Sequence, residues 1–412
     1  MAVRAVRRSA LVLGGGFAGT AVARMLRRGV TIVSPIPDLV YTPLLPEVAS
    51  GELRLKHVST PLRIVCPHAE VLAGSAVSLD TGRRVANVRG PAGDEIEVGY
   101  THLVVAVGAV PRLPPVPGLA EHALAAKTAE DFVRLRAHVL EQLAAAANET
   151  DEARRRARLT FVFVGGGYAG VETLAELQRL VQEAVRTHRV LRSAGQRWLL
   201  ADVAPQILAD IPGRLGAYAS RALERRAVEI RTGATLSSLT AGEAVLVTGE
   251  RIPTHTLVWT AGVRPAPVVE QLGLPLDARG RIVVTPTLAV EGVEHVWSAG
   301  DCAAVPNEAT SGELDPPTSQ HARQQGHRIG RNIRAVRAGR APAAYRYATL
   351  GQVATLGRFQ GTADLLGVPL TGIAGWAAAR AVHALQLPTA IQRVGVVTDW
   401  TLSLAHRRNT SA

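Results

Sequence analysis

The sequence predicts an α/β protein with two Rossmann-like dinucleotide-binding domains, one inserted in the other, and a small C-terminal region. The first reason is an internal repeat, because an apolar run, a glycine-rich loop and a helical pattern follow one another twice along the chain. The second reason is a set of three later apolar runs that each end at a glycine. The 412 residues, 47% of them hydrophobic, are enough for two or three domains with sizeable cores.

The first copy of the repeat lies near the N-terminus. Ser9–Leu13 is a short apolar strand candidate, and Gly14, Gly16 and Gly19 then form a G-x-G-x-x-G pattern before a helical pattern that continues through Arg28. In this pattern the first glycine permits a tight turn, and the second lets a pyrophosphate approach the backbone. The third allows helix and strand to pack closely, with the phosphates at the helix N-terminus.

The second copy has the same order of elements. Leu159–Val164 is the strand candidate, the glycines of the pattern are Gly165, Gly167 and Gly170, and the helical pattern continues through Val181. A single G-x-G-x-x-G pattern is a weak signal. Because both copies stand between a strand and a helix, we expect two dinucleotide sites.

The strand that closes each unit should end in an acid that binds ribose hydroxyls. In the second copy Trp198–Ala201 leads to Asp202. A carboxylate there accepts hydrogen bonds from a 2′,3′-diol and repels a 2′-phosphate, which predicts NADH rather than NADPH. In the first copy Val30–Val33 leads to the neutral Ser34, and Asp38 is the alternative ribose ligand.

Three later runs set the predicted domain boundaries. They are Leu103–Val107 before Gly108, Leu257–Ala261 before Gly262, and His295–Ala299 before Gly300 and Asp301. The first two are followed by proline-bearing segments, which are typical of crossings between domains. We therefore expect an FAD-binding domain of residues 1–115 and 272–340, an inserted NAD(H)-binding domain of residues 116–271, and a C-terminal region of residues 341–412.

The composition narrows the classes of partner. Lys and Arg together number 46 against 34 Asp and Glu, and only Lys56 and Lys127 are lysines. Arginines spread along the chain, with 4% aromatic residues, are more typical of a GC-rich bacterial genome than of a nucleic-acid platform. Anionic lipid and dinucleotides are the remaining candidate anions.

The two cysteines limit the chemistry. Cys66 and Cys302 lie far apart in the sequence, which argues against a disulfide framework, a cysteine zinc site or a C-x-x-C redox pair. No other ligand spacing suggests a metal. The sequence has no stretch of about 18 consecutive apolar residues, so no membrane-spanning helix is expected. We expect a cytoplasmic protein. If it attaches to a membrane as a peripheral protein, we expect it on the inner face of the cell membrane.

Three longer motifs carry a family resemblance. They are Y-T-P-L-L-P-E-V-A-S-G at residues 41–51, G-Y-A-G-V-E ending at Glu172, and T-S-Q-H-A-R-Q-Q-G at residues 318–326. With them nearly the whole chain resembles the bacterial type II NADH dehydrogenases (NADH:quinone oxidoreductases), within the pyridine nucleotide-disulfide-reductase-like flavoproteins. Disulfide reductases and sulfide:quinone reductases of this group need cysteine pairs near the flavin, which Cys66 and Cys302 do not supply.

The resemblance implies FAD on the first glycine loop and NADH on the second. The residues implied to contact FAD are Gly14, Gly16, Phe17, Ala18, Gly19, Ser34, Pro43, Leu44, Val77, Ala106, Gly108, Gly300, Asp301 and Gln320. The residues implied to contact NADH are Gly165, Gly167, Tyr168, Ala169, Gly170, Glu172, Asp202 and Gly262. Asp301 is expected to bond the ribityl chain, although an acid capping a helix would look the same in sequence.

Three residues are candidates for catalysis. Gln320 and Gln324 lie four apart, so both project from one helix face, and the resemblance implies that this face borders a quinone. Amides donate to and accept from quinone carbonyls without adding charge. Glu172 is implied to position the carboxamide or to relay protons. The alternatives are an exposed polar helix face for the glutamines and an acid favoured by the helix dipole for Glu172.

The C-terminal region holds two helical patterns, Gly372–Leu387 and Thr389–Ala405. Apolar residues near helical spacing in the second are Ile391, Val394, Val397 and Leu404. Trp400 is an aromatic typical of interfaces, and arginines flank the segment. These features suit a helix on a membrane surface, and the alternative is a helix packed on the FAD domain or on a homodimer partner.

The function predicted from these features is hydride transfer from NADH to FAD, followed by delivery of two electrons to a quinone-type acceptor without proton pumping. One alternative is a soluble FAD-dependent tailoring reductase that acts on a dedicated small molecule or a carrier protein. A second is a non-enzymatic redox or NADH sensor. Fold analogy alone does not choose among them.

Overall fold

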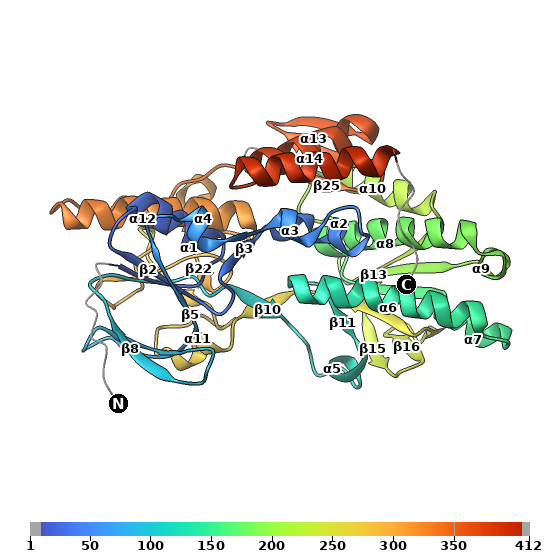
Figure 1. The fold of residues 1–412 in the computed structure, drawn as a ribbon, viewed down its shortest axis with the longest axis horizontal. Coiled ribbons are helices and arrows are strands. Elements are labelled where there is room, and N and C mark those ends of the chain that lie inside the picture. The colour runs from blue at the N-terminus through green and yellow to red at the C-terminus, as the bar shows by residue number, and fades with distance from the viewer. Residues whose placement is uncertain (1–9, 350, 406–412) are drawn as a thin grey trace. The chain divides into compact units, whose positions relative to one another are not determined.

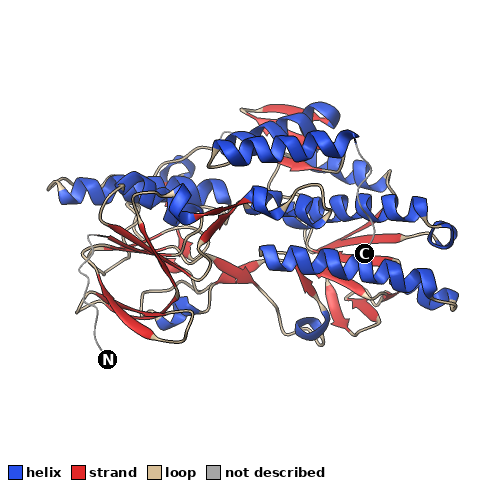
Figure 2. Cartoon of the chain, in the orientation of Figure 1, coloured by secondary structure: helices blue, strands red, loops and turns tan. Residues whose placement is uncertain are grey.

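A computed structural model describes residues 10–349 and 351–405, and the chain divides into two compact units (Figure 1). Unit 1 draws on residues 1–40, 59–110 and 263–349, and unit 2 on residues 41–58, 111–262 and 350–412. Each unit contains a parallel five-stranded sheet with helices around it, which confirms the predicted α/β class (Figure 2). The predicted division into FAD and NADH domains stays a prediction.

The sheet of unit 1 has the order β21-β9-β1-β2-β5. Its strands are β1 (Ala10–Leu13), β2 (Val30–Ser34), β5 (Glu70–Ala73), β9 (Leu103–Val105) and β21 (Val296–Ser298). Every neighbouring pair is parallel, and all residues of β1, β2, β9 and β21 are buried. Strands covered on both faces need continuous apolar runs, which is why these segments were recognisable in the sequence.

Helices and smaller strands complete unit 1. The helix α1 (Phe17–Leu26) follows the first glycine loop and packs against α12 (Ser319–Arg337). A separate antiparallel sheet holds β6 (Ser75–Asp80), β7 (Val85–Arg89) and β8 (Glu95–Gly99). The remaining elements are β3 (Asp38–Val40), β4 (Ser59–Pro61), α4 (Leu62–Val65), β10 (Ala109–Pro111), β19 (Val263–Pro265), α11 (Val268–Gln271), β20 (Ile282–Val283), β22 (Ala303–Ala304), β23 (Pro306–Asn307), η2 (Glu308–Thr310) and β24 (Glu313–Leu314).

The main sheet of unit 2 has the order β11-β18-β12-β13-β14. Its strands are β11 (Leu124–Ala125), β12 (Thr160–Val164), β13 (Arg197–Asp202), β14 (Val228–Thr232) and β18 (Thr256–Trp259). All pairs are parallel. In both sheets the strand before the glycine loop is central, and the next strand of the repeat lies beside it. The repeat seen in the sequence is therefore a repeat of topology.

Unit 2 also contains the helices that surround this sheet. The longest are α6 (Ala129–Asn148) and α8 (Tyr168–Thr187), and α8 follows the second glycine loop. The others are η1 (Thr42–Leu44), α2 (Leu45–Ala49), α3 (Leu55–Val58), α5 (Leu119–His122), α7 (Glu152–Arg158), α9 (Arg189–Ala194) and α10 (Gly213–Glu224). A small antiparallel sheet joins β15 (Leu236–Leu239), β16 (Glu243–Leu246) and β17 (Arg251–Pro253).

The C-terminal elements also group with unit 2. They are an antiparallel sheet of β25 (Gly351–Thr355), β26 (Gly361–Leu365) and β27 (Val368–Thr371), followed by α13 (Gly372–Gln386) and α14 (Ala390–Ala405). The two helices match the two predicted C-terminal helical patterns closely. Of the helices in the described part of the chain, none is long and apolar enough to cross a bilayer.

Candidate functional site

The first glycine loop leaves room beside its second glycine. A Cβ added at Gly14, whose φ is +112°, would collide with the carbonyl of Ala106, and one added at Gly19 would collide with the carbonyl of Gly14. At Gly16, apart from its chain neighbours, no atom of residues 10–349 and 351–405 lies within 4 Å of that position. Gly14 and Gly19 are thus required by packing, whereas Gly16 keeps the approach to the helix N-terminus open.

The second loop repeats this arrangement. Gly165 has φ of +116° and meets Thr260, and Gly170 meets the carbonyl of Gly165. Again nothing lies within 4 Å of a Cβ at the second glycine of the pattern, Gly167. Among the described residues no side chain caps α1 or α8, so their first N–H groups are suited to an anion. Both loops therefore have the geometry of a pyrophosphate cradle.

The closing strands place Ser34 and Asp202 in equivalent positions. Each lies beside the middle glycine of its own loop, because a Cβ at Gly15 would lie 2.9 Å from Ser34 Oγ and one at Gly166 would lie 3.2 Å from Asp202 Oδ2. The Asp202 carboxylate accepts hydrogen bonds from the backbone N–H of Gly166 and, at 2.6 Å, of Ala204. A carboxylate has further lone pairs, so these bonds leave capacity for a ribose hydroxyl.

The Ser34 hydroxyl donates a hydrogen bond to the carbonyl of Ile36, 2.6 Å away, so its oxygen can still accept one from a ligand. The alternative, Asp38, accepts a hydrogen bond from the Ser59 hydroxyl at 2.9 Å. Both lie in unit 1. The ribose contact of the first loop stays a prediction for Ser34.

Gly300 and the glutamines of α12 also belong to unit 1. The backbone N–H of Gly300 donates to the side-chain oxygen of Gln325 at 2.8 Å, and the Gln325 amide in turn donates to Asp315 at 2.9 Å. Gln325 is buried. The sequence analysis named Gln320 and Gln324 of this helix as candidates and did not include Gln325. Gln320 and Gln324 are half-buried, and the oxygen of Gln320 accepts hydrogen bonds from the hydroxyls of Tyr347 and Thr349 at 3.4 Å each.

The other residues implied to contact nucleotides are spread over both units. Phe17, Ala18, Val77, Ala106, Gly108 and Asp301 lie in unit 1, whereas Pro43, Leu44, Tyr168, Ala169 and Gly262 lie in unit 2. Leu44 is buried in η1. The buried hydroxyl of Tyr168 has no hydrogen-bond partner among the described residues. A buried polar atom without a partner, directly after the second loop, is suited to a ligand.

Glu172 lies one turn into α8 and is buried. Its carboxylate accepts a hydrogen bond from the backbone N–H of Thr355 at 2.8 Å and another from the Thr355 hydroxyl at 3.2 Å. Burial raises the pKa of Glu172 to about 7, the two bonds from Thr355 oppose this rise, and the charge of Glu176 adds to it. A carboxyl with a pKa near neutrality can take up or release a proton at working pH.

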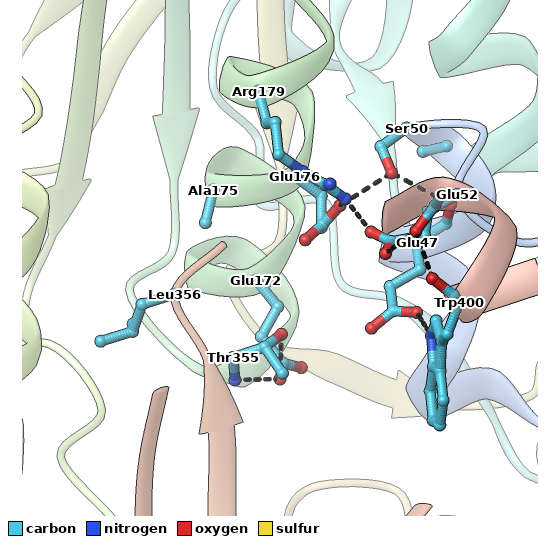
Figure 3. A network of polar contacts seen from close by, with 12 residues as sticks. Glu47, Ser50, Glu52, Glu172, Ala175, Glu176, Arg179, Thr355, Leu356 and Trp400 are labelled. Atoms are coloured by element: carbon cyan, nitrogen blue, oxygen red, sulfur yellow. Dashed lines mark hydrogen bonds and ion pairs between the residues drawn. The ribbon is translucent and has the colours of Figure 1, made fainter. Parts of the chain in front are cut away.

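A network of buried charges continues along α8 (Figure 3). The Ser50 hydroxyl donates to Glu176 at 2.8 Å. Arg179 pairs with Glu176 at 2.8 Å and also with Glu52. Glu172 is bound by the uncharged Thr355, whereas Glu176 is paired with an arginine. The proton therefore resides most easily on Glu172.

Arg380 of α13 extends the network to the C-terminal helices. Its guanidinium lies 2.6 Å from Glu52 and 3.9 Å from Glu47, and it stacks over the rings of Trp376 at 4.3 Å and Trp400 at 4.7 Å. The indole N–H of Trp400 donates to Glu47. Charged and aromatic contacts thus hold α13 and α14 to residues 41–58.

This geometry corrects one expectation for α14. Trp400 is only 7% exposed, so it is not a surface aromatic, because its indole N–H is satisfied by the buried Glu47. Ile391, at 81%, Val394 and Val397 are exposed as the helical pattern predicted. Exposed apolar residues at the C-terminal helices are Ile373, Leu385, Ile391, Val394, Val397, Leu402 and Leu404.

Comparison with known proteins places these features in context. The family described as pyridine nucleotide-disulphide oxidoreductase matches residues 8–326. Type II NADH:quinone oxidoreductase Ndh of Mycobacterium tuberculosis is 28% identical over 98% of this chain and 89% of its own length. Demethylphylloquinone reductase NdbB of Synechocystis is 28% identical over 94% of each chain.

Solved structures agree in fold. NDH2 from Plasmodium falciparum, in complex with NADH, superposes with a TM-score of 0.91 at 15% identity and covers 99% of this chain and all of that one. Sulfide:quinone oxidoreductase from Aquifex aeolicus gives a TM-score of 0.71 at 17% identity over 98% of this chain and 96% of that one. At these identities the likeness concerns the fold alone.

Proposed function

Because the chain belongs to the pyridine nucleotide-disulphide oxidoreductase family, we propose that it is an FAD-dependent NADH:quinone oxidoreductase. The resemblance to type II NADH dehydrogenases is confirmed by curated relatives of that name over nearly the whole chain. In this reaction a hydride passes from NADH to FAD, and two electrons then pass to a quinone-type acceptor without proton pumping.

The observation that carries the proposal is the open space beside Gly16 and Gly167. Two independent loops each have a glycine that no packing requires, at the N-terminus of a helix that no side chain caps. A dinucleotide pyrophosphate explains both features, because it needs close backbone approach and free N–H donors. We assign FAD to the loop of unit 1 and NADH to the loop of unit 2.

The residues of the second loop support NADH. Asp202 offers its remaining carboxylate lone pairs to the ribose hydroxyls, and its negative charge disfavours the 2′-phosphate of NADPH. The partnerless hydroxyl of Tyr168 gives the same site a further polar contact. In unit 1, Ser34 takes the ribose position with a neutral hydroxyl.

Catalysis then depends on positioning and protons. The bound flavin supplies the two-electron chemistry. Quinone reduction also consumes protons, and we assign Glu172 as a proton donor because it is buried, has a pKa near 7 and is held by Thr355. Gln320 and Gln324 offer amides to the quinone carbonyls from one face of α12.

The exposed apolar residues of α13 and α14 support a place on a membrane surface, where a quinone is found. Ile391, Val394 and Val397 are exposed on α14, whereas its Asp399 and Trp400 are buried. A helix of this kind lies in the plane of the interface. We propose peripheral attachment to the inner face of the cell membrane, and burial of the same residues in a homodimer is the competing arrangement.

The proposal is tested by mixing purified holoenzyme with NADH anaerobically and following flavin absorbance at about 450 nm. A short-chain quinone is then added. Fast bleaching followed by fast recovery is the expected result. Bleaching without recovery would favour a reductase with another acceptor, and absence of bleaching would contradict the assignment of the two loops.

A further inference from the structure

Helices α1 and α12 form a face of unit 1 that carries many arginines and no acids. The helix α12 contributes Arg323, Arg328, Arg331, Arg334 and Arg337 and contains no Asp or Glu. Its neighbour α1 contains Arg24, is followed by Arg27 and Arg28, and also has no Asp or Glu. Figure 1 shows α12 in orange beside α1, and the two helices pack together. The surface that the two helices form together is therefore strongly positive.

A pocket of about 380 Å³ opens at the C-terminal half of α12. It is lined by Arg328, Arg331, Asn332, Arg334, Ala335, Arg340, Ala341 and Ala343, and we name it the arginine pocket. Four arginines line it, three from the helix and one from the segment that follows. This volume is in the range of small-molecule sites.

The buried Asn332 fixes the shape of the arginine pocket. Its amide nitrogen donates to the carbonyls of Thr287 and Ala343 at 2.8 Å each, and its oxygen accepts from the Ala343 N–H at 3.0 Å. The loop that carries Arg340 is thus tied to α12. The backbone that carries the arginines is therefore held in place before a ligand binds, which lowers the entropy cost of binding.

The arginines of the pocket are not explained by internal ion pairs. Within residues 10–349 and 351–405, no carboxylate forms an ion pair with Arg328, Arg331, Arg334 or Arg340. Elsewhere in unit 1 surface arginines do have such partners, as Arg83 has Glu97 at 3.0 Å and Arg89 has Glu95 at 2.7 Å. An anion from outside the chain would supply the missing charge.

The helix dipole does not account for the pocket either. Basic residues in the last turn of a helix are favoured by its C-terminal carbonyls, which explains Arg334 and Arg337. This effect falls off within one turn, so it leaves Arg328 and Arg331 unexplained. The positive charge is also felt nearby, since burial and then the charges of Arg323, Arg331 and Arg24 lower the pKa of His327.

We propose that the arginine pocket binds a phosphate-bearing polyanion with two or more phosphate groups. One guanidinium group can bind two oxygens of a phosphate through two parallel hydrogen bonds. Four arginines therefore exceed what an anion with a single negative charge needs. The pocket lies beyond the glutamines along α12, because Arg328 follows Gln324 by four residues, about 6 Å of helix, and Arg334 follows it by ten residues, about 15 Å. The ligand is a soluble polyphosphate compound or a phosphorylated lipid headgroup, which share this chemistry.

The test uses the FAD holoenzyme with saturating NAD⁺, so that both glycine loops are occupied. Inorganic triphosphate is titrated by calorimetry, and sedimentation with vesicles of phosphatidylcholine, with and without a phosphoinositide, tests the lipid source. The variant is the double substitution R328Q and R331Q. The matched control, R83Q with R89Q, removes the same charge from another part of unit 1.

We expect R328Q/R331Q to weaken binding of triphosphate or of phosphoinositide vesicles at least about tenfold, and the control to bind like the original chain. Triphosphate binding identifies a soluble source, and vesicle binding alone identifies a headgroup. Equal binding by both variants, or no binding of either probe, would overturn the proposal. Circular dichroism melts of both variants check that they are folded, and NADH-dependent flavin reduction should be unchanged in both.

Discussion

The carboxylate of Glu172 accepts two hydrogen bonds from Thr355, one from the backbone N–H and one from the hydroxyl. This contact joins the start of α8 to the end of β25. Both bonds favour the ionised carboxylate, whereas burial and Glu176 favour the protonated one. The balance leaves the pKa of Glu172 at about 7, so a change at Thr355 should alter when Glu172 holds its proton.

Thr355→Val should raise the pKa of Glu172. The substitution removes one of the two hydrogen bonds to the ionised form while keeping a β-branched side chain in the strand. The alkaline limb of flavin reoxidation by quinone should therefore move upwards by about one pH unit, measured by stopped flow over a range of pH. Thr355→Ser keeps the hydroxyl and should leave the limb in place. A limb that is equal in all three proteins would contradict Glu172 as the proton donor.

Glu172→Gln should stabilise the fold at alkaline pH. The folded chain holds a proton on Glu172 up to about pH 7, whereas the unfolded chain releases it near the ordinary value of 4.5. The free energy of unfolding contributed by this group therefore falls as pH rises between those values. A neutral amide avoids the loss. We expect a gain of up to about 3 kcal/mol in urea unfolding at pH 8.

That gain should shrink towards pH 5, where Glu172 is largely protonated in the folded protein. Urea unfolding at both pH values measures the difference. If the amide destabilised the protein equally at pH 5 and pH 8, the fold would require the ionised carboxylate of Glu172 and not its protonated form.

Gly167→Ala and Gly170→Ala should have opposite effects. No atom lies near a Cβ at Gly167, so the first variant should keep its melting temperature while its KM for NADH rises about tenfold or more. At Gly170 the Cβ would collide with the carbonyl of Gly165, so the second variant should lose stability. Flavin content in Gly167→Ala should stay normal, whereas Gly16→Ala should lose flavin. The reverse pattern would exchange the two nucleotide assignments.

Asp202→Ala should narrow the preference for NADH over NADPH, because it removes the charge that repels a 2′-phosphate. Asp202→Asn is the matched control, since its amide oxygen can still accept a hydrogen bond from Gly166 or Ala204. Both variants should gain kcat/KM for NADPH relative to NADH. An unchanged ratio in both would remove Asp202 from the ribose site and leave it a purely structural role in the loop.

The double variant Gln320→Ala and Gln324→Ala should slow the second half-reaction only. Both amides project from one face of α12, and loss of hydrogen bonds to the acceptor should slow flavin reoxidation by quinone about tenfold or more. Reduction of the flavin by NADH should be spared. If stopped-flow traces show both half-reactions slowed to the same extent, the pair supports the fold rather than the acceptor.

The sequence predicted the two loops and sheets well because their signals are local. A buried parallel strand needs a continuous apolar run, and the loop needs glycines at fixed offsets, so both are visible within about 20 residues. Ser34 and Asp202 could be matched to each other for the same reason. The structure then places each beside the middle glycine of its loop.

The buried charge network was not predictable in this way. It joins Glu47 and Glu52 to Arg179 and Arg380, which come from distant parts of the sequence with no common spacing. The prediction for Trp400 as a surface aromatic was wrong because its partner, Glu47, is remote. Gln325 was missed because the spacing of four residues from Gln320 selects Gln324. Only the packed helix shows that Gln325 is the buried glutamine.

The ion pairs between residues 41–58 and α13 also set an order of events during translation. The early segment that carries Glu47 and Glu52 leaves the ribosome long before Arg179, and longer still before Arg380 and Trp400. Until those partners are synthesised, its carboxylates remain hydrated and its helices lack the residues against which they pack. Unit 2 can reach its final form only after α14 has emerged, so slow or interrupted synthesis would expose this segment to proteases and chaperones.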